Sequence, residues 1–440
     1  MHPSFANFEQ RLHDAFGHHA SCERPLASSG LGARLHGVDL SAPLTAPQVE
    51  LLLDGLSHFR LLTIPGQDLG RFSLAHFERF ANHWGAPVPH PSNFLRGGKP
   101  AQQDGISDGK IEYMPFAERR VAVANATLPD QLQCMRHESP AVLVATNLLG
   151  ESATNRTSIK PGGTWHTDIE YEPLPIYVSM FLVHHAPRGE SDRDWIEASP
   201  ETTGVYHDGA SDELMRLRLQ LPRNGETAFT DTAAAFAALP QSRRETLAAM
   251  SVRRRLNQDD EGWLAPLVRK DPRSGIQSLH SPVWASRPNV RPPVTLDGMS
   301  ESEARACLDE LEEHVLQPEF RYDHVHTQGD VTIWNNYMTL HTSPPIKVDV
   351  HDKQDARLLY RLSCKGAPSL SLPRRDDPSW IAAHINGAYV TPEAILNRAA
   401  RDTHIARRTA CQTTHHRVMS RDERDGLEPG DVWQHQRAAS

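Results

Sequence analysis

The sequence predicts a mainly β fold with helical decoration, built around a double-stranded β-helix, the jelly-roll core of cupin-like proteins. Two observations support this fold class. The strand candidates are short, and regularly alternating helices do not join them, which argues against a doubly wound parallel sheet and for a sheet sandwich or barrel. No period of roughly 20 to 50 residues recurs, which excludes solenoids and propellers.

The first half of the chain contains two helix candidates and two strand candidates. Residues 46–59 place apolar side chains at helical spacing, and 60–65 then predicts a short buried strand that a Pro-Gly turn ends. A second amphipathic helix is expected over 73–84. The sequence is polar and loop-like between 91 and 140, and 141–147 predicts the next buried strand.

The second half adds a helix with a clear start signal. Ser300 and a glutamate three residues later form a capping box, which predicts a helix over 301–316. Further helices are expected at 232–239 and 243–250, and further strands at 177–184, 330–334 and 357–363.

One enlarged domain with two appendages is the expected organisation. Residues 1–29 are polar and rich in histidine, which indicates an N-terminal arm or a loosely docked helix, with organised structure starting near Gly30. The domain covers 30–366. Residues 367–440 form a C-terminal extension of low apolar content, in which a helix is expected at 392–401.

The composition indicates a soluble globular protein and excludes two kinds of partner. The 440 residues are 23% charged and 38% hydrophobic, and no apolar run approaches the roughly 20 residues that a membrane-spanning helix needs. The start of the chain lacks the layout of a signal peptide, so a cytoplasmic location is expected. The 46 basic residues are scattered, without the stripe that nucleic acid binding requires. The expected partner is a small-molecule substrate, and a homo-oligomer is left open.

His166 and Asp168, two positions apart, are the first candidate metal ligands. At the end of a strand, residues two apart point to the same side, so both side chains can reach one metal ion. With one imidazole from elsewhere they would form a two-histidine, one-carboxylate triad, which leaves three positions open and suits Fe(II). The pair alone is weak evidence, because a chain with 25 histidines produces such a pair by chance.

The segments around this pair, taken in order, carry more weight. The pair lies in Gly-Gly-Thr-Trp-His-Thr-Asp at 162–168, and a Gly-Asp-Val-Thr-Ile-Trp-Asn-Asn segment leads to His341. Arg357 and Arg361 follow on a late strand. The chain thereby resembles the Fe(II)/2-oxoglutarate dioxygenases typified by taurine dioxygenase and 2,4-dichlorophenoxyacetate dioxygenase. The resemblance covers roughly 30–366 and extends to segments 30–44, 60–67, 225–229 and 318–320.

The resemblance implies which residues bind the iron and the co-substrate. The expected Fe(II) ligands, which are also the catalytic residues, are His166, Asp168 and His341. The family anchors the distal carboxylate of 2-oxoglutarate with a threonine and an arginine, which Thr227 and Arg357 match. Because the loop after His341 is longer than in taurine dioxygenase, Arg361 stays an alternative to Arg357. The carboxylate at position 168 argues against a halogenase.

The resemblance also implies a set of substrate contacts. His90 matches a histidine that holds the anionic group of the substrate in taurine dioxygenase, and Arg361 matches its partner. Asn93 and Ile169 are expected beside them. Asn93 and Gly162 stand where taurine dioxygenase has a tyrosine and an asparagine, so taurine itself is not expected. The expected substrate is a small metabolite that is anionic or amino-acid-like.

Two insertions, at 95–140 and 188–224, enlarge the expected domain. Long insertions beside the mouth of an active site are often lids, substrate walls or subunit contacts. Candidate wall residues are Tyr113, Trp195 and Tyr206, with burial in a local core as the alternative.

The reaction that the resemblance implies is oxidation of an unactivated C–H bond with Fe(II), 2-oxoglutarate and O2, most often hydroxylation, with release of succinate and CO2. Desaturation, cyclisation and cleavage of a bond to a heteroatom stay open, because the sequence does not set the substrate geometry. Two rival functions use the same three ligands. One is a non-catalytic jelly-roll protein that binds the metal structurally, and the other is a zinc hydrolase, for which no His-Glu-x-x-His motif is present.

Overall fold

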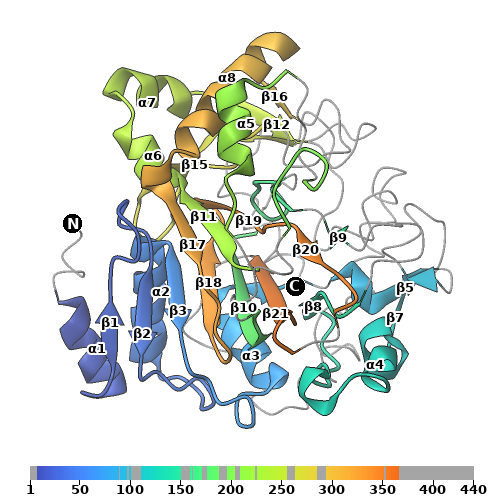
Figure 1. Ribbon diagram of the computed structural model, residues 1–440. Coiled ribbons are helices and arrows are strands. Elements are labelled where there is room, and N and C mark those ends of the chain that lie inside the picture. The colour runs from blue at the N-terminus through green and yellow to red at the C-terminus, as the bar shows by residue number, and fades with distance from the viewer. Residues whose placement is uncertain are drawn as a thin grey trace.

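A mixed sheet of eight strands forms the centre of the molecule (Figure 1). The computed structural model describes residues 7–88, 90–96, 99–100, 111–149, 159–160, 162–170, 176–187, 196–203, 209–222, 225–254, 263–284, 294–350 and 353–365. In spatial order the strands of this main sheet are β1 (Ser21–Glu23), β2 (Ala33–His36), β3 (Leu61–Ile64), β18 (Val331–Asn335), β10 (Val178–His185), β21 (Leu358–Lys365) and β4 (Ala86–Pro87), and β8 (Leu143–Thr146) also pairs with β21. Strands β2 and β3 are parallel and the other pairs are antiparallel.

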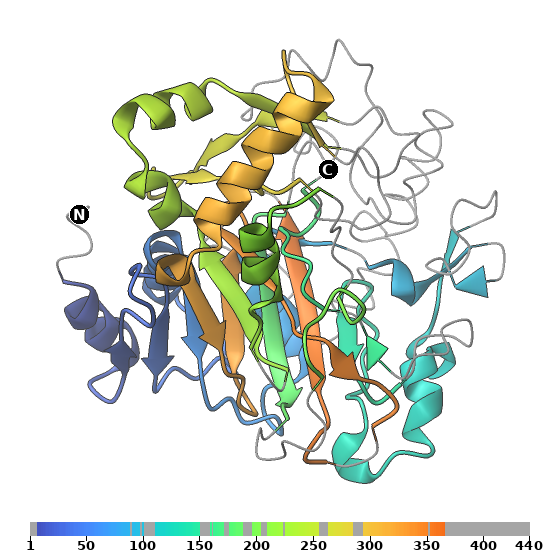
Figure 2. The same cartoon turned by 45° about the horizontal axis from the view of Figure 1, so that its top comes forward.

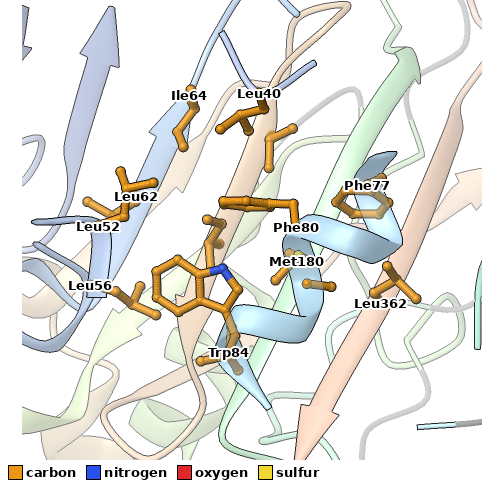
Figure 3. Close-up of a cluster of buried hydrophobic side chains, with 14 of the residues drawn as sticks. Leu40, Leu52, Leu56, Leu62, Ile64, Phe77, Phe80, Trp84, Met180 and Leu362 are labelled. Carbon is orange, nitrogen blue, oxygen red and sulfur yellow. The ribbon is translucent and has the colours of Figure 1, made fainter. Parts of the chain in front are cut away.

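Helices cover one face of the main sheet, here called the outer face. Helix α2 (Ala46–Phe59) begins at a capping box formed by Thr45 and Gln48, and α3 (Leu74–Ala81) begins at Ser73. Figure 3 shows their apolar side chains meeting those of β3, β10 and β21, with Trp84 and Phe80 in the middle of the cluster. Helix α1 (Phe8–Phe16) joins this core through two buried side chains.

The opposite, inner face of the sheet carries polar side chains beside a smaller apolar cluster. Side chains alternate between faces along a strand, so Val178, Met180 and Leu182 of β10 lie in the outer core while Ser179 and Phe181 point inward. The same alternation along β21 puts Arg361 on the inner face, because its neighbours Tyr360 and Leu362 belong to the outer core. The inner face is therefore where a functional site can form.

A second sheet of three strands lies over this inner face. Its order is β17 (Arg321–His324), β11 (Thr227–Asp231) and β19 (Thr339–Thr342), all antiparallel. Phe229 of β11 packs between the sheets, with its ring centroid 5.6 Å from that of Trp334 in β18. Thr227 and His341 lie on the same inward side as Phe229, because Thr227 is two residues away on β11 and His341 pairs with Phe229 across the strands.

Helices and short strands build a third layer on the other side of the small sheet (Figure 2). The helices are α5 (Asp212–Leu219), α6 (Thr232–Ala238), α7 (Gln241–Ala248) and α8 (Glu301–Val315). The strands are β12 (Ser251–Arg254), β13 (Trp263–Pro266), β14 (Val268–Lys270), β15 (Gln277–Leu279) and β16 (Val294–Leu296). Arg218 of α5 and Glu312 of α8 form a buried bidentate ion pair, with Nε–Oε1 and Nη2–Oε2 distances of 2.7 and 2.6 Å. None of the helices in the described ranges is both long and apolar enough to cross a membrane.

Several elements differ from the sequence-based expectations. Organised structure does not start near Gly30, because Phe8 and Leu12 are buried and β1 pairs with β2. The region around 95–140 is not only loop, since it holds β5 (Phe94–Arg96), β6 (Lys99–Pro100), β7 (Ile111–Tyr113) and α4 (Arg120–Asn125). The short pair β9 (Ile159–Lys160) and β20 (Ile346–Lys347) was not expected either.

Four of the sequence-based expectations fall on residues or side chains that the structure does not describe. Trp195, Tyr206 and the helix at 392–401 lie outside the described residues, as does the side chain of Tyr113. The division into an arm, a domain at 30–366 and an extension at 367–440 stays a prediction.

Glu78 of α3 gives the fold a testable pH dependence. Its side chain is fully buried, and burial raises the pKa of the carboxyl from 4.5 to about 7, against smaller lowering effects of Ser139 and Arg119. Between these values the unfolded chain is ionised at this position while the folded protein keeps its proton. The free energy of unfolding therefore falls as the pH rises from 4.5 to 7.

The variant Glu78→Gln should lose this dependence. As the pH rises from 4.5 to 7, we expect the free energy of unfolding of Glu78→Gln to increase by about 3 kcal/mol relative to that of the wild type, because one pKa unit corresponds to about 1.4 kcal/mol. Urea unfolding at a series of pH values measures the difference, with the exposed Glu118→Gln as a control that leaves the wild-type pH profile in place. An unchanged profile for Glu78→Gln would mean that the carboxyl is not buried as described.

Candidate metal centre

His166 and His341 face each other across two backbone hydrogen bonds. The His166 N–H donates to the His341 carbonyl over 3.1 Å, and the His341 N–H donates back over 2.9 Å, which forms an isolated antiparallel bridge. Gly162 allows the segment before His166 to approach the chain after β19, because a Cβ there would lie 2.3 Å from the Ser343 carbonyl oxygen and the Pro344 carbonyl carbon. The bridge brings two distant parts of the sequence together at the inner face.

Asp168 completes a group of three metal-binding side chains. The Nε2 atoms of His166 and His341 lie 3.7 and 3.6 Å from Asp168 Oδ1. One ligand atom from each residue lies within 4.8 Å of the others, and no other such group of histidine, cysteine, aspartate or glutamate occurs within the described ranges. His166 and Asp168 thus meet as expected, but at a bridge and turn rather than in a regular strand.

The surroundings of the two imidazoles suit metal binding. His166 Nδ1 lies 2.8 Å from the Thr164 carbonyl oxygen, which only accepts, so Nδ1 carries the hydrogen and Nε2 keeps its lone pair. Burial lowers the pKa of His341 well below its usual value, so this imidazole is neutral at pH 7. Its ring packs against those of Trp334 and Phe229, at centroid distances of 5.1 and 6.1 Å.

A polar network fixes the Asp168 carboxylate. Ser179 Oγ donates to Asp168 Oδ2 over 2.5 Å, and Asn336 Nδ2 donates to Ser179 Oγ over 3.0 Å. Arg361 forms an ion pair with Asp168 Oδ1. Burial alone would raise the pKa of Asp168, but the Arg361 guanidinium and the hydrogen bond from Ser179 hold it well below its usual range. The carboxylate is therefore ionised, as a metal ligand must be.

Ile169, directly after Asp168, has a left-handed backbone with φ of 49°. A β-branched side chain in this region costs on the order of 1–3 kcal/mol, and such strain tends to occur at functional sites. Two imidazoles and one carboxylate form the donor set that suits Fe(II), and an ionised Asp168 beside a free Nε2 on His166 fits a divalent cation. The residues present therefore fit the metal that the sequence predicts.

Arg357 and Arg361 occupy two different environments. Arg357 Nε donates to the Gly225 carbonyl over 3.1 Å, and within the described ranges its two terminal nitrogens make no hydrogen bond. Burial lowers the pKa of Arg357 to about 10, which leaves the guanidinium charged at pH 7. Arg361 instead lies at Asp168 and influences His90. The two arginines therefore serve different parts of the inner face.

Thr227 lies on the Arg357 side of the site. Its Oγ1 is 2.8 Å from Nε2 of His326, a buried histidine that the sequence-based analysis missed. Burial lowers the pKa of His326 well below its usual value, with smaller effects from His324 and Arg357, so the ring is neutral. His326 Nδ1 is buried without a hydrogen-bond partner in the described structure.

His90 and Asn93 lie on the Arg361 side but differ in what they offer. The Ser92 N–H donates to His90 Nδ1 over 3.2 Å, and burial together with Arg361 lowers the pKa of His90 to about 3. His90 is therefore neutral, with its hydrogen on Nε2. Asn93 Nδ2 donates to the carbonyls of Pro140 and Val142, both over 2.9 Å, which gives its amide a structural role. Substrate contact by Asn93 and Ile169 stays a prediction.

Ser179 and Asn336 are further site residues that the sequence-based analysis did not identify. Asn336 lies in the Trp-Asn-Asn segment before His341, so a signal for it was present in the sequence. Ser179 is one serine within an apolar strand, and only the strand register brings it to Asp168.

Comparison with known proteins agrees with the site. The family model described as "Taurine catabolism dioxygenase TauD, TfdA family" matches residues 23–362. Pentalenolactone F synthase of Streptomyces arenae is 27% identical over 318 residues, which cover 72% of this chain and 88% of that protein. The alpha-ketoglutarate-dependent 2,4-dichlorophenoxyacetate dioxygenase of Cupriavidus pinatubonensis (strain JMP 134 / LMG 1197) is 34% identical over 138 residues, 27% of this chain and 45% of that protein.

Among solved structures, a taurine dioxygenase from Burkholderia xenovorans is 22% identical, covers 83% of this chain and 98% of its own, and superposes with a TM-score of 0.48. The structure of AAD-2 in complex with Mn(II) and N-oxalylglycine is 17% identical, covers 80% of this chain and 100% of its own, and has a TM-score of 0.46. The family assignment rests on the family model, which matches most of the chain. The chain belongs to the TauD, TfdA family of dioxygenases and is an oxidoreductase that depends on Fe(II) and 2-oxoglutarate.

Proposed function

We propose that this enzyme oxidises a C–H bond of a small anionic or amino-acid-like metabolite, most often by hydroxylation, with His166, Asp168 and His341 as its iron ligands. The observation that carries the proposal is the meeting of these side chains at the bridge on the inner face. Iron bound there supplies O2 activation coupled to decarboxylation of 2-oxoglutarate to succinate and CO2. Ser179 and Arg361 keep the carboxylate ionised and in position.

In this proposal Arg357 and Thr227 hold the distal carboxylate of 2-oxoglutarate. The terminal nitrogens of Arg357 are free of hydrogen bonds within the described part of the chain, and a guanidinium fork binds a carboxylate bidentately. The unpartnered Nδ1 of the neutral His326 is best left without a hydrogen, so its Nε2–H donates to Thr227 Oγ1. The hydroxyl hydrogen of Thr227 then remains available for the carboxylate.

Arg361 and His90 form the substrate side. Arg361 supplies a positive charge, and the neutral His90 supplies a hydrogen-bond donor at Nε2. This pair suits a carboxylate or sulfonate group. The name of the Cupriavidus relative also indicates an aryloxyacetate, a carboxylate, as its substrate.

The same proposal includes the type of core fold, the cellular location, the partners and the alternative reaction outcomes. The two sheets that enclose Phe181, Phe229 and Trp334 support a double-stranded β-helix as the core. The sequence favours a cytoplasmic location without nucleic acid or membrane partners, and a homo-oligomer is left open. Desaturation, cyclisation or heteroatom-bond cleavage are the alternative outcomes, since they use the same iron and 2-oxoglutarate.

A screen of candidate substrates tests the proposal. Succinate release is measured with Fe(II), 2-oxoglutarate and O2 for panels of amino acids, aryloxy acids, sulfonates and peptide-like metabolites. We expect an anionic compound to raise succinate release well above the rate without substrate, and product analysis then identifies the bond attacked. Stimulation only by cationic or uncharged compounds would contradict the role of Arg361 and His90.

The two arginine environments predict a division of kinetic effects. Arg357→Ala should raise the KM for 2-oxoglutarate about 10- to 100-fold, because hydrogen bonds to a charged group contribute about 1.5–3 kcal/mol. His90→Ala should raise the KM for the substrate found in the screen and leave that for 2-oxoglutarate near the wild-type value. Initial rates under variation of each compound measure both constants. Equal effects of the two variants on both constants would refute the division.

A further inference from the structure

A second group of buried side chains, two arginines and one histidine, lies in the third layer, apart from Arg357 and Arg361. Burial lowers the pKa of His280 well below its usual value, so the histidine ring is neutral at pH 7. Arg254 ends β12, Arg269 lies in β14, and His280 directly follows β15 (Figure 1 labels β12 and β15). Their exposed fractions are 3%, 8% and 0%. Burial lowers the pKa of Arg254 to about 10, with a raising effect of Glu170 and a lowering effect of Arg269, so both guanidinium groups are charged at pH 7.

The contacts of the group hold it in place without neutralising it. Arg254 Nη2 donates to the carbonyls of His280 and Ser281 over 2.6 and 2.8 Å. Ser281 has a left-handed φ of 48°, which is uncommon for a residue other than glycine. Arg269 lies over the ring of Tyr337, with its Cζ 5.3 Å from the ring centroid. The backbone and an aromatic face therefore position both guanidinium groups.

Many hydrogen-bonding atoms of this group have no partner in the described structure. They are Arg254 Nε and Nη1, Arg269 Nε, His280 Nδ1 and Nε2, and Ser281 Oγ. Burying such atoms unpaired is destabilising, and more so for charged groups. So many orphaned atoms in one place indicate that a ligand accepts hydrogen bonds there.

The balance of charge indicates the sign of this ligand. Within the described part of the chain, the Glu170 carboxylate is the negative charge that acts on Arg254, and Arg269 is influenced by the Tyr337 phenol. Among the described residues, two buried positive charges with one carboxylate leave a positive excess, and a buried charge is stable only when it is paired. A ligand that accepts hydrogen bonds and carries a negative charge satisfies both requirements.

We propose that Arg254, Arg269 and His280 form a binding pocket for a small oxyanion, with a carboxylate as the ligand class. The pocket adjoins the metal centre through two chain segments. Glu170 follows the ligand Asp168 by two residues, and Tyr337 follows Asn336, which is hydrogen-bonded to Ser179. The carboxylate belongs either to a free anion or to the substrate, and the pocket does not depend on the proposed substrate class.

Thermal unfolding in acetate tests the pocket without any turnover. The melting temperature of the full-length protein is measured from low salt upward in sodium acetate, with sodium chloride at equal ionic strength as reference. We expect acetate to raise the Tm of the wild type by a few degrees and to saturate. Arg269→Met should be more stable than the wild type in low salt, because it removes an uncompensated charge, and should lose the saturable rise.

Three further variants make the result specific. Arg254→Met should behave like Arg269→Met, whereas Arg119→Met, which removes a buried arginine elsewhere in the fold, should keep the acetate response. Arg357→Met should also keep it. Loss of the response in Arg357→Met alone would place acetate in the 2-oxoglutarate site and overturn the proposal. A Tm of Arg269→Met below that of the wild type in every buffer, with an unchanged acetate response, would overturn it as well.

Kinetics then distinguish the two sources of the carboxylate. These measurements use the substrate from the screen. If acetate raises the KM of the wild type for this substrate but leaves the KM of Arg269→Met unchanged, the pocket binds the substrate carboxylate. If acetate leaves the KM of the wild type unchanged while the Tm still rises and saturates, the pocket binds a free anion. Failure to find a substrate would count against the proposed function but would not change the Tm results.

Discussion

The backbone bridge between His166 and His341 is the contact on which the site depends. Two reciprocal hydrogen bonds tie the segment after Gly162 to strand β19, and the small sheet then fixes β19 through β11. Because the bridge aligns the two residues directly, both imidazoles point to the same side and Asp168 follows within reach. Without this alignment His341 would not face the segment that carries His166 and Asp168, and no common metal position would exist.

The inner face combines buried charge with a rigid scaffold. Asp168, Arg361 and Arg357 are buried or largely buried between two sheets, where an unpaired charge would be costly. The outer core of α2 and α3 supplies apolar burial on the opposite face of the same strands, and the third layer does so for the small sheet. Packing on the outward faces therefore stabilises the strands, so their inward side chains can be polar and can form the site. His326 and Ser179 are examples of such inward side chains, because they contact Thr227 and Asp168, respectively.

Regular elements with strong local signals were predictable. The helix over 46–59 has the expected bounds, and Ser300 with Glu303 begins α8 as the capping box indicates. The strands at 227–231 and 339–342 were not predicted, because short strands of mixed composition become strands only through their partners. The burial of Phe8 and Leu12 in the N-terminal helix was not predicted, because it depends on packing against α2, which the local sequence does not show.

The same limit applies to the site. Order along the chain indicated the three candidate metal ligands and both arginines, but it did not predict the different environments of Arg357 and Arg361. These environments depend on the register of β21 against β10 and on the position of Gly225, and tertiary contacts set both. Ser179, His326 and the cationic group at Arg254 carry no motif, so only packing reveals them.

The most direct test of the account is an anaerobic titration of the purified protein with Fe(II) and 2-oxoglutarate, followed by visible absorption. The account predicts a weak charge-transfer band in the wild type and in Asp39→Ala, an exposed carboxylate variant, and no band in Asp168→Ala. A band of full intensity in Asp168→Ala, or none in the wild type, would contradict the assignment of His166, Asp168 and His341 as the iron site.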